Sequence, residues 1–365
     1  MPGETPVKTS EIQSTLTRIW NDLDGTNKMR ACLFNLIFYT ESGQRADYIR
    51  EIAHKVVEKF PSRIIFISSD KNAPVGSLSA KVSVITATTG ESDVACDLIE
   101  IDVAKSEHSR VPFVILPHIL PDLPVYFLWG EDPKIDDPIF KEISKFSTRI
   151  IFDSEASEAL PPFAKSLLHQ YTVLHNDVAD LNWARIENWR DVLSTTFCTP
   201  NKLAHLENAS EISISFNAAS STFFCHTNIQ ALYLQAWIAG QLNWSLTKTE
   251  KQKETLKFTY NKASGPVTVL LSPAQCANLA PGMVSSFDLS TNDQFHYNYA
   301  CHPDQPHKIV LNFSTHELCE MPSEFLFQKG EKGQSLVKEI CHRGMSSHYL
   351  KVLEQICKID VRLLC

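Results

Sequence analysis

Hydrophobic residues in the first half of the chain form short continuous runs, and segments with helical spacing separate several of them. The runs have the length of strands that are buried on both faces, as in parallel sheets. They lie at residues 31–40, 61–70, 124–130 and 148–154. Two alternating runs, 80–89 and 97–104, are typical of edge or antiparallel strands. Strands that alternate with helices predict an α/β fold with a largely parallel, doubly wound sheet.

The second half of the chain has a different pattern, which predicts an α+β domain with an antiparallel sheet. Residues 180–197 and 228–244 have strong helical periodicity. Alternating runs without intervening helices follow, as expected for antiparallel strands, at 255–260, 266–272, 295–301 and 308–314. Two further helical patterns close the chain. We therefore expect an N-terminal helix within 1–28, an α/β sheet domain at 29–165, and an α+β domain at 166–365.

Charge and hydropathy exclude several classes of partner. The formal net charge is −8, whereas nucleic acids and anionic membrane surfaces attract basic patches. No apolar segment approaches the roughly 18 residues that a membrane-spanning helix needs. The first residues lack the basic and apolar regions of a signal peptide. These observations predict a cytoplasmic protein without a nucleic-acid or membrane partner.

The ten cysteines do not predict a metal site. They are scattered along the chain without a Cys-x-x-Cys pair, which favours free thiols in a reducing compartment. Cys-His dipeptides occur at 225–226, 301–302 and 341–342. Adjacent residues point in different directions on a strand or helix, so a dipeptide rarely supplies two ligands to one ion.

One short segment can bind an anion. Thr40, Ser42, Gly43 and Gln44 follow the first strand and open a helix, where backbone N–H groups attract phosphate. The alternative is that Ser42 simply caps that helix. The chain has neither the G-x-G-x-x-G nor the G-x-x-x-x-G-K-[ST] pattern, so we expect no nucleotide cofactor.

Catalytic signatures are absent from the sequence. There is no G-x-S-x-G motif, and His54, His108, His118 and His169 stand beside no signature serine or cysteine. A triad assembled in space stays open at this point, because its members need not be close in the sequence. We therefore name no catalytic residue and expect a protein that is not an enzyme.

Four residues are candidates for contact with a protein partner. Trp129 ends an apolar strand where acidic residues begin, which predicts partial exposure and contact with a partner; the alternative is a half-buried strand end without such a contact. Asp122 precedes the same strand in the string LPDLPV. Arg185 and Arg190 flank the tryptophan stripe of the 180–197 helix, where they can pair with a partner's carboxylates or be solvated.

Several strings, taken in order, resemble the OpcA family of glucose-6-phosphate dehydrogenase assembly proteins. The resemblance runs from about residue 30 to 245 and is carried by RACLFNLIFY, PSRIIFIS, VPFVILPHILPDLPVYFLWGEDP, TRIIFDS, VADLNWARIENWRDVL and ALYLQAWIAGQLNW. It implies a non-enzymatic protein that binds glucose-6-phosphate dehydrogenase, promotes its active oligomer and acts as a positive effector in the oxidative pentose phosphate pathway. The alternative is a sugar-phosphate-binding enzyme or metabolite sensor with its phosphate site at the Ser42 helix start.

Overall fold

A computed structural model describes residues 5–23, 28–89, 92–133, 136–221, 226–342 and 344–363. The chain divides into two compact units, and neither is continuous in sequence. Unit 1 contains residues 1–156, 170–181 and 332–344, whereas unit 2 contains 157–169, 182–331 and 345–365. The sequence pattern predicts a single boundary near residue 165, which places 170–181 and 332–344 in the C-terminal domain. No helix within the described residues is long and apolar enough to cross a membrane.

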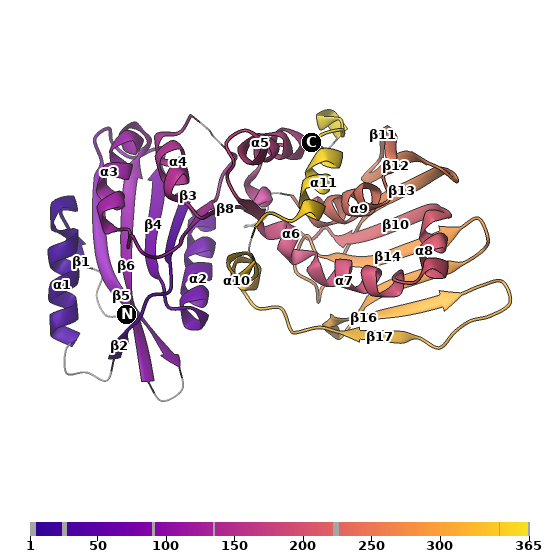
Figure 1. Cartoon of the computed structure of the whole chain (residues 1–365), viewed down its shortest axis with the longest axis horizontal. Coiled ribbons are helices and arrows are strands. Elements are labelled where there is room, and N and C mark those ends of the chain that lie inside the picture. The colour runs from indigo at the N-terminus through magenta and orange to yellow at the C-terminus, as the bar shows by residue number, and fades with distance from the viewer. Residues whose placement is uncertain are drawn as a thin grey trace. The chain divides into compact units, whose positions relative to one another are not determined.

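Unit 1 is built on a nine-stranded sheet whose central part is parallel (Figure 1). The strands are β1 (Thr5–Val7), β2 (Lys28–Arg30), β3 (Asn35–Glu41), β4 (Arg63–Asp70), β5 (Leu78–Thr89), β6 (Ser92–Ala104), β7 (Val125–Trp129), β8 (Arg149–Phe152) and β9 (Val178–Asp180). Six of them run parallel in the order β6-β4-β3-β7-β8-β9. This is the order of a doubly wound dinucleotide-binding sheet, and it confirms the predicted fold class of the first domain.

The two alternating runs of this region have different surroundings. β5 pairs antiparallel with β6 and β1, as the pattern predicted. β6 also pairs in parallel with β4, so it lies inside the sheet. Its charged residues are tolerated there because Asp97 pairs with Arg63 and Arg30, and Glu100 pairs with Arg50.

Helices cover both faces of the parallel sheet. The helices of this unit are α1 (Ile12–Leu23), α2 (Gln44–Lys59), α3 (Val111–Ile115), α4 (Pro138–Ile143) and α10 (Gln334–Cys341). One face packs against α2 and α10 through residues such as Phe38, Ile52 and Leu336. On the opposite face, Phe140 of α4 contacts the rings of Phe127 and Trp129. Strands enclosed in this way carry continuous apolar runs, because both of their faces are removed from water.

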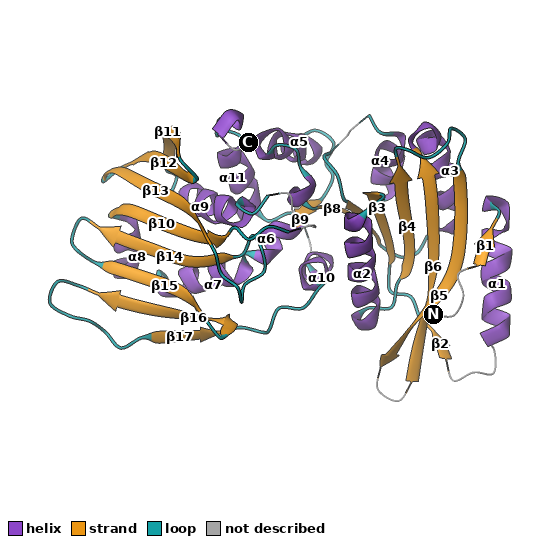
Figure 2. Cartoon of the chain, turned by 180° about the vertical axis from the view of Figure 1, so that it is seen from behind, coloured by secondary structure: helices purple, strands orange, loops and turns teal. Residues whose placement is uncertain are grey.

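Unit 2 contains an eight-stranded, largely antiparallel sheet (Figure 2). Its strands are β10 (Ala209–Asn217), β11 (Ser245–Gln252), β12 (Thr255–Lys262), β13 (Gly265–Ala274), β14 (Val284–Thr291), β15 (His296–His302), β16 (Gln305–Ser314) and β17 (Ser323–Leu326). The order is β11-β12-β13-β10-β14-β15-β16-β17, and among the described strands of this sheet the β10–β13 pair alone is parallel. This sheet confirms the predicted α+β character of the second half.

The helices of the second half differ from their predicted bounds. The helices are α5 (Leu160–Thr172), α6 (Leu181–Arg185), α7 (Glu187–Thr196), α8 (Pro200–Glu207), α9 (Ile229–Gln241) and α11 (Ser347–Ile356). The segment predicted as one helix at 180–197 is interrupted at Ile186, which separates α6 from α7. α9 is buried from Ile229 to Gly240, and the sheet together with α11 packs around it.

Candidate functional site at the carboxyl edge of the parallel sheet

The strand order changes direction between β3 and β7, and ligands of doubly wound sheets bind beside the carboxyl ends of such strands. The four residues of the predicted anion site lie here. Thr40 is completely buried in β3, whereas Ser42, Gly43 and Gln44 are exposed at the start of α2. Their role as an anion site stays a prediction.

The alternative role of Ser42, as the cap of α2, is not what the structure shows. Gly43 occupies the N-cap position with a φ of 132°, and no side chain accepts a capping hydrogen bond there. The Ser42 hydroxyl lies 3.0 Å from the Ser68 hydroxyl instead. A glycine at this position is required because few other residues adopt such a φ.

Carboxylates surround this edge of the sheet. Arg45 of α2 donates a 2.8 Å hydrogen bond to Asp153, which is buried at the end of β8. Because β7 lies between β3 and β8, this ion pair spans the end of β7. Glu131 is buried immediately after β7, and Glu41 pairs with Lys71. At this edge the Asp153 and Glu41 carboxylates are therefore each paired with a cation, and Glu131 adds a buried carboxyl group.

Trp129 is completely buried, so the prediction that it is partly exposed is wrong. Its ring stacks on Tyr39 with 3.9 Å between the ring centroids, and Phe140 packs against its other side. The indole N–H donates to the carbonyl oxygen of Asp132 at 2.8 Å. The acidic turn after β7 therefore folds back over Trp129, and the burial removes this residue from the interface candidates.

A Ser-His-Asp chain of hydrogen bonds, which the sequence analysis did not find, lies at the same edge. The Ser69 hydroxyl is 2.8 Å from Nε2 of His108, and Nδ1 of His108 is 2.8 Å from Oδ2 of Asp137. Ser69 is near the end of β4, His108 follows β6, and Asp137 caps α4 through Oδ1. These are the residue types and contacts of a catalytic triad.

The environment of this triad fixes its members in place. Burial by itself raises the pKa of Asp137. The hydrogen bond from His108, its charge, and the N–H groups of Ile139 and Phe140 outweigh that effect and hold the pKa below its ordinary value. Burial, reinforced by the Glu131 and Asp137 carboxylates, raises the pKa of Tyr39 far above its ordinary value. A neutral tyrosine and an ionised aspartate therefore flank Ser69 and His108.

The serine of this triad is enclosed. Ser69 is 2% exposed, and its backbone lies in the sheet between Glu41 of β3 and Val103 of β6. A cavity of about 690 Å³ adjoins His108 and Asp137 but does not include Ser69 in its lining. Attack on a carbonyl group needs an accessible hydroxyl and nearby oxyanion donors. The two hydrogen bonds of His108 instead hold three segments together: the end of β4 through Ser69, the segment after β6 that contains His108, and the start of α4 through Asp137.

The remaining interface candidates lie in different units. Asp122 is exposed in unit 1. In unit 2, Arg185 donates to the Asn182 side chain at 2.9 Å, and Arg190 lies 3.5 Å from the ring centroid of Trp183. Both arginines are partly exposed, and Arg190 also donates to the carbonyl oxygen of Trp183 at 3.2 Å, across the break between α6 and α7. Their roles in partner binding stay predictions.

The described residues contain no cluster of three or more His, Cys, Asp or Glu side chains that could hold a metal ion. They also contain eight free cysteines. The Cys-His dipeptides 301–302 and 341–342 thus contribute to no such cluster, and Cys225 lies outside the described residues.

Two family models match the chain in succession. The model described as the glucose-6-phosphate dehydrogenase subunit N-terminal domain matches residues 53–167. The model described as the C-terminal domain of the same subunit matches residues 176–351. Together the two matches cover most of the chain and most of both compact units.

Individual proteins show a more distant similarity. A protein named OpcA from Synechococcus elongatus, whose name refers to the OxPP cycle, is 23% identical over 53% of this chain and 42% of its own length. Its counterpart in Synechocystis is 26% identical over 53% of this chain and 40% of its own length. The chain thus matches less than half the length of these relatives.

A solved structure shares the fold. Levoglucosan dehydrogenase, in complex with NADH, superimposes with a TM-score of 0.50 over 90% of this chain and 96% of its own, at 9% identity. Such a low identity shows the fold alone. The two family matches carry more weight, because they cover the sequence of both units: the chain belongs to the OpcA family of glucose-6-phosphate dehydrogenase subunits.

Proposed function

We propose that this protein is a non-enzymatic assembly factor and positive effector of glucose-6-phosphate dehydrogenase, which it binds in the oxidative pentose phosphate pathway. The observation that carries the proposal is the pair of family matches, since both family descriptions name a subunit of that dehydrogenase. A subunit acts through contact with its partner, and an effector does so by binding one state of the partner more tightly than another.

The carboxyl edge of the parallel sheet supports a role without catalysis. A dinucleotide would bring its pyrophosphate to the start of α2, where Arg45 is already paired with the buried Asp153 carboxylate. The enclosed hydroxyl of Ser69 is likewise unsuited to attack on a substrate. Both features favour a scaffold that has the doubly wound fold but works without a cofactor or a reaction of its own.

The proposed contact has to bury a substantial surface. Stable protein interfaces remove about 800 Å² from water on each partner. Exposed Asp122 and partly exposed Arg185 remain the candidates for such a surface, whereas Arg190 is held against Trp183. We also infer a cytoplasmic location, which the free thiols of the described cysteines support.

The proposal is tested by mixing this protein with the dehydrogenase from the same organism. We expect one complex in size-exclusion chromatography with light scattering, and an increase in kcat/KM of the dehydrogenase in a steady-state NADPH assay. Unchanged kinetics and separate elution at micromolar concentrations would reject the proposal.

A pair of variants tests the contact itself. Arg185→Glu is expected to weaken the complex, since it reverses a charge on a candidate contact residue. Arg362→Glu is the matched control, because Arg362 is an exposed arginine of the same unit that pairs with Asp360, two residues away. Equal loss of binding in both variants would show that net charge, not a contact at Arg185, explains the effect.

A second candidate function is a sensor of sugar phosphates. It is favoured by the exposed Ser42, Gly43 and Gln44 at the start of α2, a 16-residue helix without a side-chain cap. The two functions are compatible, because an effector can also respond to a metabolite.

A further inference from the structure

The two edges of the unit 2 sheet are protected to different degrees. At one edge, β11 carries Lys248 and Lys251, and its pairing with β12 is shifted by a bulge between Leu246 and Lys248. Lysines and bulges are the usual means by which proteins prevent an edge strand from pairing with another chain. This edge is therefore closed to strand addition.

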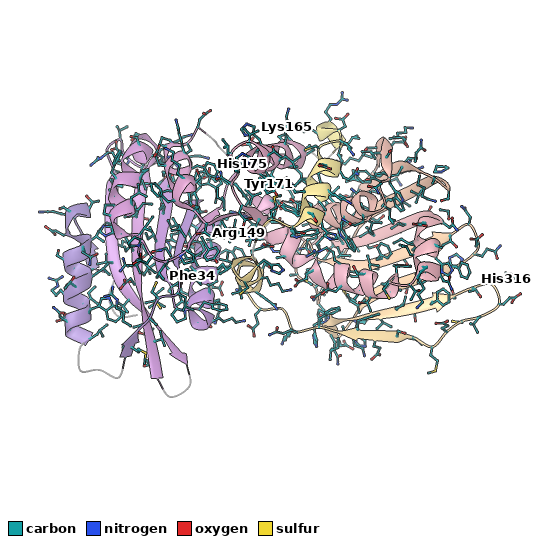
Figure 3. The ribbon with its side chains drawn as sticks, in the orientation of Figure 1. Phe34, Arg149, Lys165, Tyr171, His175 and His316 are labelled. Atoms are coloured by element: carbon teal, nitrogen blue, oxygen red, sulfur yellow. The ribbon has the colours of Figure 1, made fainter. Side chains whose placement is uncertain are left out.

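The opposite edge has neither feature. β17 pairs with β16 without a register shift, and it is the last strand of the sheet among the described residues (Figures 1 and 2). Large apolar side chains are concentrated on it and on the preceding turn: Leu318 is 56% exposed, Met321 90% and Leu326 71%. Figure 3 shows His316 at the outer end of this β16–β17 hairpin, pointing away from it.

The alternation of hydrogen bonds between β17 and β16 shows which backbone groups of β17 face outward. Phe327 donates its N–H to the carbonyl oxygen of His307 at 2.9 Å. In an antiparallel pair, every second residue exchanges hydrogen bonds with the neighbouring strand, so Phe325 and Ser323 also face β16. The N–H and C=O groups of Glu324 and Leu326 consequently point to the outer side of the sheet.

We propose that this edge pairs with β17 of a second copy of the chain, antiparallel and across a twofold axis at Phe325. In this register the outward N–H and C=O groups of Leu326 form hydrogen bonds with those of Glu324 in the second copy. The outward groups of Glu324 likewise form hydrogen bonds with those of Leu326 in the second copy. Each copy thus satisfies both outward-facing residues of the other, and the two sheets become one continuous sheet.

Side chains favour this register over its neighbours. Lys308 lies opposite Leu326 on β16 and pairs with Glu324 in the same copy at 2.7 Å. In the dimer, Glu324 of the second copy lies beyond Leu326 in the same row, within reach of Lys308, and the two Phe325 rings face each other. An axis at Glu324 would place two glutamates opposite each other and would pair Leu326 with Pro322, which has no N–H.

The dimer would add to the proposed function without depending on it. A twofold assembly presents each contact surface twice, so it binds an oligomeric target with higher avidity than a monomer does. Self-association is measured on the purified protein alone. A failure here therefore leaves the proposed role in dehydrogenase assembly untouched.

The first experiment is sedimentation velocity from about 1 to about 100 µM, where a dimer gives a concentration-dependent mass. Leu326→Pro removes an outward N–H without touching the bonds to β16, and it should raise the dimer dissociation constant more than about tenfold. Leu326→Val keeps that N–H and is the matched control. A second control, Val75→Lys, changes an apolar residue of unit 1 that is even more exposed than Leu326. Circular dichroism confirms that each variant is folded.

The second experiment tests the register in which the two β17 strands pair. Residues facing each other at a non-hydrogen-bonded position are close enough for a disulfide. In a Cys319→Ser background, Phe325→Cys should therefore form a covalent dimer on mild oxidation, well above the background chain, whereas Leu326→Cys should not. A monomeric wild-type protein at all concentrations would overturn the proposal, and so would a dimer that Leu326→Pro leaves intact. If the wild-type protein is monomeric and Leu326→Pro loses binding to the dehydrogenase, the β17 edge is instead a contact surface for the dehydrogenase.

Discussion

Arg149 of β8 donates a 2.7 Å hydrogen bond to the Glu339 carboxylate of α10, although 190 residues separate the two in the chain. Arg149 also bonds the carbonyl oxygens of His342 and Gly344, so it fixes the returning segment 332–344 to the parallel sheet. Both side chains are about 5% exposed. Arg149→Met should lower the free energy of unfolding by about 3–5 kcal/mol, because it leaves a buried carboxylate unpaired.

Urea denaturation measures this loss, and a double variant provides its control. Arg149→Met with Glu339→Leu removes both charges and should recover a large part of the stability. If the double variant is as unstable as the single one, the unpaired carboxylate is not the cause of the loss.

Asp97 should make the stability of unit 1 depend on acid pH. Burial alone raises the pKa of Asp97, but the charge of Arg63 and the hydrogen bonds from Trp20 and Arg63 outweigh it and lower the pKa. The folded pKa thus lies below the unfolded value of about 3.9. The resulting stabilisation is complete above about pH 4 and disappears as the pH falls through the folded value.

The comparison that isolates this effect is between wild type and Asp97→Asn. At pH 7 the variant should be less stable by about 3–5 kcal/mol, since Arg63 is buried without its counter-ion. The difference should shrink below about pH 4. Asp304→Asn changes an exposed carboxylate and should give a small difference at every pH. A wild-type advantage that is already lost above about pH 4 would contradict the lowered pKa of Asp97, because a lowered pKa keeps this carboxylate ionised to a lower pH.

Trp129 should behave as a core residue. Trp129→Ala removes a ring that stacks on Tyr39 and packs against Phe140, and it should cost about 3–5 kcal/mol of stability. Phe113→Ala is the control, because Phe113 is 79% exposed and its loss should change stability by less than about 0.5 kcal/mol. A Trp129→Ala protein with wild-type stability and weaker dehydrogenase binding would restore the interface prediction for this residue.

The hydrophobic pattern predicted the parallel strands of unit 1 well, because burial on both faces leaves a continuous apolar run. Strands β10 and β14 were not predicted. Each alternates apolar residues with Ser, Asp or Glu, since one face of the unit 2 sheet is not covered by helices. The charged strand β11 carries no apolar run because it lies at the sheet edge.

The candidate site could not be predicted, because contacts between residues far apart in the sequence form it and no local pattern indicates such contacts. Ser69 and His108 are 39 residues apart, and His108 and Asp137 are 29 apart. The order of the strands in the sheet brings them together, and that order is not encoded in any single segment. Trp129 was mistaken for a half-exposed residue because the sequence does not show that the following turn folds back and accepts a hydrogen bond from its indole.

The Ser-His-Asp chain should be unreactive in the folded protein. A fluorophosphonate probe needs the serine hydroxyl to be accessible, and Ser69 is enclosed between β3 and β6. We expect intact-protein mass spectrometry to show no adduct after prolonged incubation. His108→Ala should instead lower the stability by about 1–3 kcal/mol, because it leaves buried partners without their hydrogen bonds. Labelling that disappears in Ser69→Ala and slows in His108→Gln would identify a catalytic serine and overturn the proposal that this protein is not an enzyme.

Thermal unfolding with metabolites decides whether the start of α2 binds phosphate. Arg45, the arginine in the first turn of α2, is already paired with the buried Asp153 carboxylate, so we expect no rise in Tm with glucose 6-phosphate, 6-phosphogluconate or NADP. A ligand at about 100 times its dissociation constant would add about 2.7 kcal/mol to the stability, which is easily detected. Sodium sulfate at matched ionic strength controls for salt effects. A rise with glucose 6-phosphate that Gln44→Glu abolishes would establish the metabolite sensor, because the substitution places a carboxylate at the first residue of α2 and leaves Gly43, with its φ of 132°, unchanged.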